Sequence, residues 1–242
     1  MSWFEEWFNS PYYHILYSHR NEEEAQYFID NLLAFLKPVN TAKFLDLACG
    51  KGRHSKYISS KGYETIGIDI AADSIQDAKK FENSKLRFYV HDMRLPFPES
   101  GFDYILNLFT SFGYFNEPSD NLKVLQNVVN ALNPSGVFVL DFLHLHYVEK
   151  HLIPKETIQR KGIIFHITRK IDGGFIYKNI EVVDDKKYYT YHEKVQALQL
   201  DDFNKMFLQV GLKIFQQFGD YNLTDFDKDS SPRLILLAQK EA

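Results

Sequence analysis

The amino-acid sequence predicts an α/β fold, in which a doubly wound, mostly parallel sheet carries an inserted antiparallel β meander. From residue 43 onward, short segments that are apolar on both faces alternate with amphipathic segments. This pattern is typical of a parallel sheet with helices on both sides. Between about residues 155 and 199, apolar and polar residues alternate one by one, which indicates antiparallel strands with one solvated face.

The individual elements follow from these local patterns. Residues 21–37 carry apolar side chains at helical spacing, and Pro38 ends that helix. Strands are expected in the main sheet at 43–48, 64–70, 86–91, 102–109 and 137–142, and in the meander at 162–171, 173–185 and 186–198. We expect four segments: a helical amino-terminal segment (1–40), an α/β core (41–154), the β insertion (155–199) and a carboxy-terminal completion of the core (200–242).

Composition narrows the functional classes. The chain has 242 residues, of which 45% are hydrophobic and 25% charged, as expected of a soluble globular protein. Its 28 Lys and Arg against 32 Asp and Glu give a formal charge of −4. Because nucleic-acid binding usually requires a basic surface, a nucleic-acid partner is disfavoured.

The sequence also favours the cytoplasm. Cys49 is the single cysteine, so an internal disulfide is impossible, which fits a reducing compartment. The amino end lacks the pattern of a secretory signal, and no apolar stretch approaches the ~20 residues that a membrane span requires. We therefore expect a cytoplasmic protein that does not enter a membrane.

A glycine-rich turn is the first candidate for a ligand site. The stretch FLDLACGKGRHS reads as a buried strand, a turn with Gly50 and Gly52, and the start of a helix. The next strand ends in Asp69, whose carboxylate is placed to accept hydrogen bonds from two ribose hydroxyls. Both a nicotinamide dinucleotide and S-adenosylmethionine fit this arrangement.

Three details favour S-adenosylmethionine. The third small residue of the dinucleotide fingerprint is replaced by Ser55. Asp46 lies inside the first strand, where its charge suits an ammonium group and a ribose but repels a pyrophosphate. Asp92 and Met93 follow the third strand, as an acid and an apolar residue suited to an adenine amino group and its ring.

Four segments together carry a resemblance to a known family. DLACGKGRHS, IGIDI, HDMRLPFPESGFDYILNLFTSFGYF and LNPSGVFVLDF resemble, in order and spacing, the motifs of class I S-adenosylmethionine-dependent methyltransferases. The resemblance runs from about residue 40 to 143, and the end of the chain fits the family's last helix and two strands. It implies a seven-stranded, Rossmann-like sheet with one antiparallel strand near its edge, and S-adenosyl-L-methionine as the cofactor.

The resemblance also implies roles for matching positions. Asp46, Ala48 and Gly50 would contact the methionine end of the cofactor, Asp69 the ribose, and Asp92 with Met93 the adenine. The other positions expected at the cofactor are Gly52, Ile70, Asn107 and Leu108, the last two beneath the transferable methyl group. Ala48 departs from the family pattern, in which many members have glycine.

Aromatic residues flank this predicted site. The run LFTSFGYF supplies Phe109, Phe112, Tyr114 and Phe115, and aromatic faces suit cationic intermediates. By resemblance to relatives that act on small molecules, the amino-terminal segment is expected to form a lid over the cofactor. It would contribute Tyr17 and also Arg20, which would pair with the cofactor carboxylate.

No residue is singled out as an obligatory base. Tyr114, His144 and His146 are candidates, and an acceptor that is already nucleophilic needs none. The histidines lack a further ligand at a spacing typical of metal sites, so no metal is expected.

The sequence therefore predicts a methyltransferase that uses S-adenosyl-L-methionine on a small-molecule acceptor. A nicotinamide-dependent oxidoreductase and a non-catalytic S-adenosylmethionine-binding regulatory protein remain alternatives, the second because the family has no universal catalytic residue. The acceptor atom and the oligomeric state are left open by the sequence.

Overall fold

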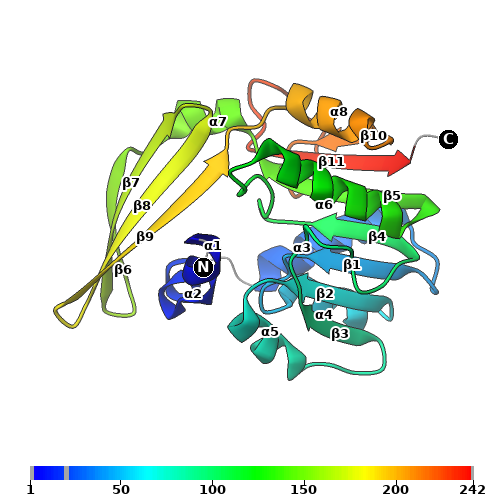
Figure 1. Ribbon diagram of the computed structural model, residues 1–242, viewed down its shortest axis with the longest axis horizontal. Helices are drawn as coiled ribbons and strands as arrows, with labels where there is room; N and C mark the ends of the chain where they lie inside the picture. The colour runs from blue at the N-terminus through cyan, green and yellow to red at the C-terminus, as the bar shows by residue number, and fades with distance from the viewer. Residues whose placement is uncertain (1–2, 19–21, 241–242) are drawn as a thin grey trace.

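The computed structural model describes residues 3–18 and 22–240. Its larger part is built around a seven-stranded sheet (Figure 1). Its strands lie in the order β10-β11-β5-β4-β1-β2-β3. β11 is antiparallel to β5 and β10, and the other neighbouring strands are parallel. The strands are β1 (Lys43–Leu47), β2 (Glu64–Asp69), β3 (Leu86–Val90), β4 (Phe102–Asn107), β5 (Leu132–Leu143), β10 (Leu212–Phe218) and β11 (Arg233–Lys240). This confirms the predicted doubly wound sheet and its single antiparallel strand.

Helices bury both faces of this sheet. α3 and α4 pack on one face, where Phe28 and Ile58 join Phe44 of β1 in a buried cluster. α6 and α8 cover the other face, where Leu125 and Phe203 belong to a second cluster. The helices are α3 (Glu22–Leu36), α4 (Arg53–Ser60), α5 (Ala72–Lys79), α6 (Pro118–Ala131), α7 (Leu145–His151) and α8 (Leu200–Gln209). Because both faces are covered, the middle of each central strand is largely apolar, and polar side chains gather toward the strand ends.

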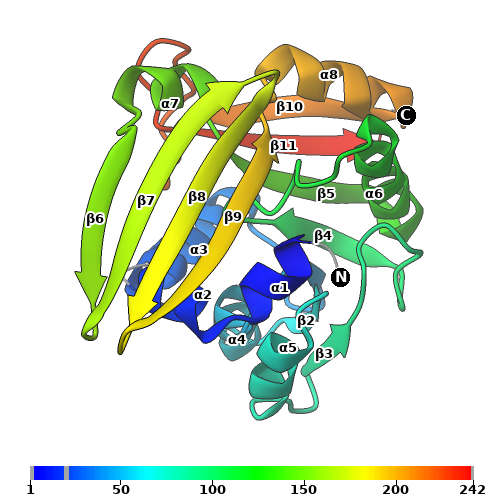
Figure 2. The same ribbon diagram turned by 60° about the vertical axis from the view of Figure 1, so that its left-hand side comes forward.

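A separate antiparallel sheet of four strands is inserted between α7 and α8. Its strands are β6 (Lys155–Arg160), β7 (Ile163–Asp172), β8 (Phe175–Asp184) and β9 (Lys187–Gln196), in sequential order. Helices α1 (Trp3–Asn9) and α2 (Pro11–Leu16) pack against it, and Trp7 and Leu16 share a buried cluster with Phe165. Figure 2 shows both helices between this sheet and the main sheet, and α1 contacts both β9 and α5.

The structure adds two elements that the sequence patterns did not predict. β6 has the sequence KETIQR, in which Ile158 is the one apolar residue, and it is held by antiparallel pairing with β7. α7 follows β5 directly and leads into the second sheet. Among the described residues, no helix is both long enough and apolar enough to cross a bilayer.

Candidate active site

A cavity of about 620 Å³ lies where the main sheet, the amino-terminal helices and the antiparallel sheet meet. It opens beside the carboxyl ends of β1, β2 and β4, the position at which open α/β sheets bind their ligands. Of the residues predicted at the cofactor, those that line it are Tyr17, Ala48, Gly50, Asp69, Ile70, Asp92, Met93 and Leu108. Asp46, Gly52 and Asn107 are not among the lining residues, and Arg20 lies outside the described residues.

The turn after β1 has a left-handed backbone. The φ angles of Ala48, Gly50 and Gly52 are +56°, +55° and +74°, a region that L side chains rarely adopt. A Cβ on Gly52 would lie 2.5 Å from the ring of Phe88, whereas one on Gly50 would meet nothing within 4 Å. Gly52 is therefore required by packing as well as by conformation, and Gly50 leaves open space at the cavity.

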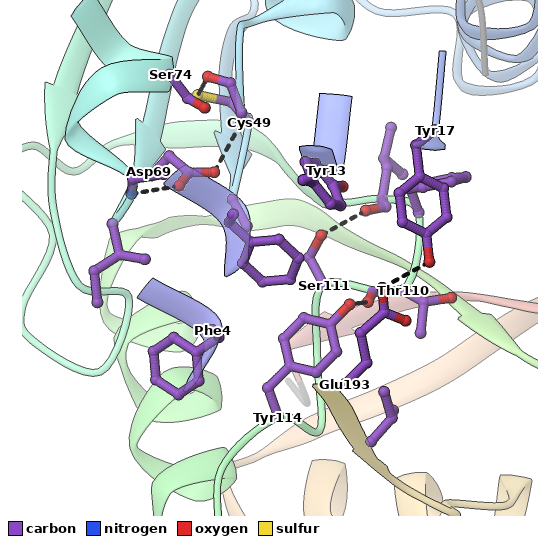
Figure 3. A pocket seen from close by; sticks show the side chains of 18 of the residues that line it. Phe4, Tyr13, Tyr17, Cys49, Asp69, Ser74, Thr110, Ser111, Tyr114 and Glu193 are labelled. Atoms are coloured by element: carbon purple, nitrogen blue, oxygen red, sulfur yellow. Dashed lines mark hydrogen bonds between the residues drawn. The ribbon is translucent and has the colours of Figure 1, made fainter. Parts of the chain in front are cut away.

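Asp69 connects this turn to the next strand. Its Oδ2 accepts a hydrogen bond from the backbone N–H of Gly50 at 2.8 Å, and its Oδ1 accepts one from that of Ala71 at 2.7 Å. The side chain is buried, and burial raises the pKa of Asp69 while these hydrogen bonds oppose the shift. The Asp69 carboxylate thus holds the turn after β1 and the loop after β2 together, and it faces the cavity (Figure 3).

Asp46 lies behind the turn. It is 1% exposed, and its Oδ2 accepts a hydrogen bond from Ser55 Oγ of α4 at 2.5 Å. Burial raises the pKa of Asp46 to about 7, although the hydrogen bond from Ser55 lowers it. This carboxyl group therefore changes charge near neutral pH, directly below the glycine turn.

The remaining predicted cofactor residues differ in their surroundings. Both oxygens of Asp92 accept hydrogen bonds from Arg94, which lower the pKa of Asp92 although burial opposes the shift. Asn107 is fully buried, and its Nδ2 donates to the carbonyl of Leu47 at 3.2 Å. Leu108 is the first residue after β4; it is buried and lines the cavity.

Aromatic side chains form much of the cavity wall. Phe109, Tyr114 and Phe115 line it after β4, whereas Phe112 is fully buried in the core. From the amino-terminal helices, the lining residues include Phe4, Phe8, Tyr13 and Tyr17. The Tyr13 and Tyr17 rings lie 5.0 Å apart, so α2 presents a continuous aromatic surface to the cavity.

The three candidate bases are not placed alike. Tyr114 lines the cavity, but its hydroxyl donates to the carbonyl of Thr110, and burial raises the pKa of Tyr114 well above its ordinary value. It is therefore a hydrogen-bond donor at neutral pH. His144 is buried with Nδ1 2.7 Å from the carbonyl of Ser231, and neither His144 nor His146 is among the lining residues.

Several lining residues with charged side chains were not identified from the sequence. Arg53 begins α4 and lies 4.9 Å from the Phe109 ring centroid. Arg169, Lys178 and Glu193 come from three neighbouring strands of the antiparallel sheet. Glu193 could have been identified from the sequence YTYHEKV. In a strand, alternate residues share one face, so Glu193 is the charged residue on a face that otherwise carries Tyr189, Tyr191 and Val195.

Comparison with known proteins agrees with this geometry. A family model described as a methyltransferase domain matches residues 44–136. The chain is 24% identical to a putative methyltransferase, YqeM, of Bacillus subtilis, over 82% of this chain and 84% of that one. It is 25% identical to a glycine/sarcosine N-methyltransferase of Halorhodospira halochloris, over 92% of this chain and 82% of the relative.

Solved structures share the whole fold. An S-adenosylmethionine-dependent methyltransferase from Clostridium acetobutylicum superposes with a TM-score of 0.81 at 19% identity, covering 96% of both chains. Neither a nicotinamide-dependent enzyme nor a non-catalytic protein is supported by these comparisons. The matched domain spans the glycine turn, Asp69 and the β4 segment, and relatives match beyond it into the antiparallel sheet. Residues 44–136 therefore form a methyltransferase domain, the protein is an S-adenosylmethionine-dependent methyltransferase, and S-adenosyl-L-methionine is its cofactor.

Proposed function

We propose that this methyltransferase acts on a small-molecule acceptor and that the acceptor atom is an amine nitrogen. The observation that carries the proposal is the cavity of about 620 Å³, which extends from the ends of the parallel strands to the antiparallel sheet. Its size is in the range of small-molecule sites. Aromatic residues from α1 and α2 line it, so a folded macromolecular acceptor has little room. A cytoplasmic location remains a prediction from the sequence.

The residues present fit the cofactor. We propose that Asp69 binds the ribose, that Asp92 and Met93 lie at the adenine, and that the turn at Ala48 and Gly50 adjoins the methionine end. Arg53 lines the same cavity and suits the cofactor carboxylate, the partner that the family resemblance predicted for Arg20. When bound, the cofactor supplies a methyl group already activated by its sulfonium. The chain then has to align the acceptor and exclude water.

The nitrogen acceptor is supported by the relatives and by the cavity wall. Glycine/sarcosine N-methyltransferases from three organisms are similar to this chain over 92% of its length. Methylation of an amine places positive charge on nitrogen as the bond forms. The rings of Tyr13, Tyr17 and Tyr114 provide aromatic faces for that charge.

The proposal is tested by ligand-dependent unfolding and by product analysis. S-Adenosylhomocysteine at 100 times its dissociation constant should stabilise the protein by about 2.7 kcal/mol. At a few degrees per kcal/mol, the melting temperature should rise by roughly 5–10 °C. Incubation with methyl-labelled cofactor and small amines should move the label into the small-molecule fraction.

Asp69→Ala is the decisive variant for the cofactor. Loss of a charged acceptor of two ribose hydrogen bonds should weaken S-adenosylhomocysteine binding by about 100-fold or more, at roughly 1.5–3 kcal/mol for each bond. Asp73→Ala removes an exposed carboxylate four residues along the chain and serves as the matched control. Equal binding by the two variants would contradict the assignment of Asp69. Label found in protein or nucleic acid alone would contradict a small-molecule acceptor.

A further inference from the structure

A row of charged side chains crosses the inner face of the antiparallel sheet between two apolar rows, and its first member, Arg169, is paired with Glu156 of β6. Arg169 pairs in register with Lys178, and Lys178 with Glu193. The neighbouring row, Ile167, Ile180 and Tyr191, is apolar, as is the row of Ile171, Ile176 and Val195 on the other side. All three charged residues line the cavity, so the sheet directs a narrow polar strip at the acceptor region.

Glu193 is the acid of this strip. Among the described lining residues, the other acids are Asp69, the last residue of β2, and Asp92, shortly after β3, both at the opposite wall. Figure 3 shows Glu193 beside Tyr114 and Thr110, on a different side of the cavity from Asp69. The side chain of Glu193 is 16% exposed, so its charge acts with little screening by water.

The hydrogen bonds that the described residues donate to the Glu193 carboxylate all reach one oxygen. Its Oε1 accepts hydrogen bonds from Trp7 Nε1 at 2.8 Å and Tyr17 Oη at 2.7 Å, and lies 3.8 Å from Lys178 Nζ. Oε2 receives no hydrogen bond from the described residues. A carboxylate has about four acceptor sites, so a partly buried oxygen without a donor is suited to a ligand N–H group.

We infer that Glu193 binds the acceptor amine through Oε2 and orients its nitrogen for methylation, which makes it the specificity-determining residue of the site. The inference rests on the proposed function and identifies the side chain that selects an amine. Tyr17 and Tyr114 lie on either side of this carboxylate (Figure 3), and Tyr13 lines the same cavity, so the bound nitrogen meets aromatic faces. Burial and then the charge of Glu193 raise the pKa of each tyrosine, which reflects this proximity.

The surrounding charges suit a neutral amine better than an ammonium ion. Transfer needs the nitrogen lone pair, and Lys178 lies close enough to Glu193 to oppose a second full positive charge. A neutral amine donates N–H to Oε2 and keeps its lone pair for the methyl carbon. The N–C bond forms as the S–C bond breaks, its electron pair stays on the sulfur, and the resulting ammonium loses one proton to water.

A structural role for Glu193 makes a different prediction. Its Oε1 connects α1, through Trp7, and the end of α2, through Tyr17, to the antiparallel sheet. Glu193→Gln retains an oxygen that accepts both hydrogen bonds but removes the charge. A residue that only fastens the helices would tolerate this change. Glu181→Gln, at an exposed position of the same sheet, is the matched control.

The experiment measures ligand preference on the complete chain loaded with S-adenosylhomocysteine. Benzylamine and glycine are titrated against benzyl alcohol and glycolate, their hydroxyl counterparts, by calorimetry at constant pH. We expect the wild type and Glu181→Gln to bind at least one amine about 10-fold more tightly than its hydroxyl counterpart. Glu193→Gln should lose this preference while its affinity for S-adenosylhomocysteine changes less than 2-fold. With an amine that is methylated, kcat/KM should fall about 100-fold.

Each contrary result is distinct. If the wild type shows no preference for either amine, or if Glu193→Gln retains the preference, the inference is overturned. Failure of the wild type to bind S-adenosylhomocysteine would instead contradict the proposed function. If Glu193→Gln alone loses cofactor affinity together with melting temperature, Glu193 fastens the helices and does not select the acceptor.

Discussion

The two walls of the cavity are built in different ways. The wall at the ends of the parallel strands is held by backbone geometry: left-handed φ angles at Ala48, Gly50 and Gly52, and two amide hydrogen bonds to Asp69. The wall formed by the antiparallel sheet and the amino-terminal helices is held by side chains, with hydrogen bonds from Trp7 and Tyr17 to Glu193.

This difference matches the demands on each wall. A cofactor common to a whole family can be bound by a backbone shape that few residues can form. An acceptor that differs among relatives is better recognised by side chains, which change without altering the backbone. Substitutions at the two walls should therefore lower the stability of the protein by different amounts.

The largest expected effect concerns the buried acid below the cofactor wall. Burial raises the folded-state pKa of Asp46 to about 7, above its ordinary 3.8, so the folded protein holds this proton more tightly than the unfolded chain. Stability is therefore lost as pH rises from about 4 to about 7, by an amount on the order of 4 kcal/mol. Asp46→Asn should remove this loss, so the variant should be more stable than the wild type at pH 8.

The measurement is urea unfolding of both proteins at pH 4, 5.5 and 8. Only the difference between them matters, because other carboxylates also titrate in this range. Ser55→Ala should steepen the dependence, since the Ser55 hydrogen bond lowers the pKa of Asp46. A constant difference across the three pH values would show that Asp46 has an ordinary pKa.

The next effect compares a glycine in the turn after β1 with a glycine in the antiparallel sheet. Gly52→Ala places a Cβ 2.5 Å from the Phe88 ring at a φ of +74° and should cost about 2–4 kcal/mol, from overpacking and backbone strain together. Gly173, in the turn between β7 and β8, has a φ of +56° but open space around it, so Gly173→Ala should cost only about 1 kcal/mol. Thermal unfolding of the two variants measures the difference, and equal losses would mean that packing at the glycine turn is unimportant.

The smallest effect tests the side-chain wall. Tyr17→Phe removes a hydroxyl that donates to Glu193 at 2.7 Å and accepts from Lys178 at 2.6 Å. We expect a loss of about 1.5–3 kcal/mol, typical of a hydrogen bond to a charged group. Tyr188→Phe removes an equivalent hydroxyl from a side chain that is 79% exposed on β9 and should be neutral. Chemical denaturation of both variants compares them, and indistinguishable stabilities would mean that this contact does not fasten α2.

Part of the cofactor wall was predictable because its signals are local. Gly50, Gly52 and Asp69 lie within 20 residues of one another, and the apolar strands around them are continuous in sequence. The same patterns predicted the parallel sheet and the meander, since strand type follows from which faces are buried. β6 was missed because KETIQR has almost no apolar pattern and becomes a strand only by pairing with β7.

The sequence alone was enough to predict the fold class, the S-adenosyl-L-methionine cofactor and most of the cavity residues near the glycine turn. Backbone conformation and strand burial depend on short stretches of sequence, so local patterns reveal them. Only the tertiary structure decided which side chains share the cavity. It excluded His144 and His146 from the lining, placed Asp46 behind the turn, and brought Glu193 to within hydrogen-bond distance of Tyr17. Those last two residues are separated by 176 positions, so no local pattern relates them, and they meet because the antiparallel sheet folds back over the amino-terminal helices.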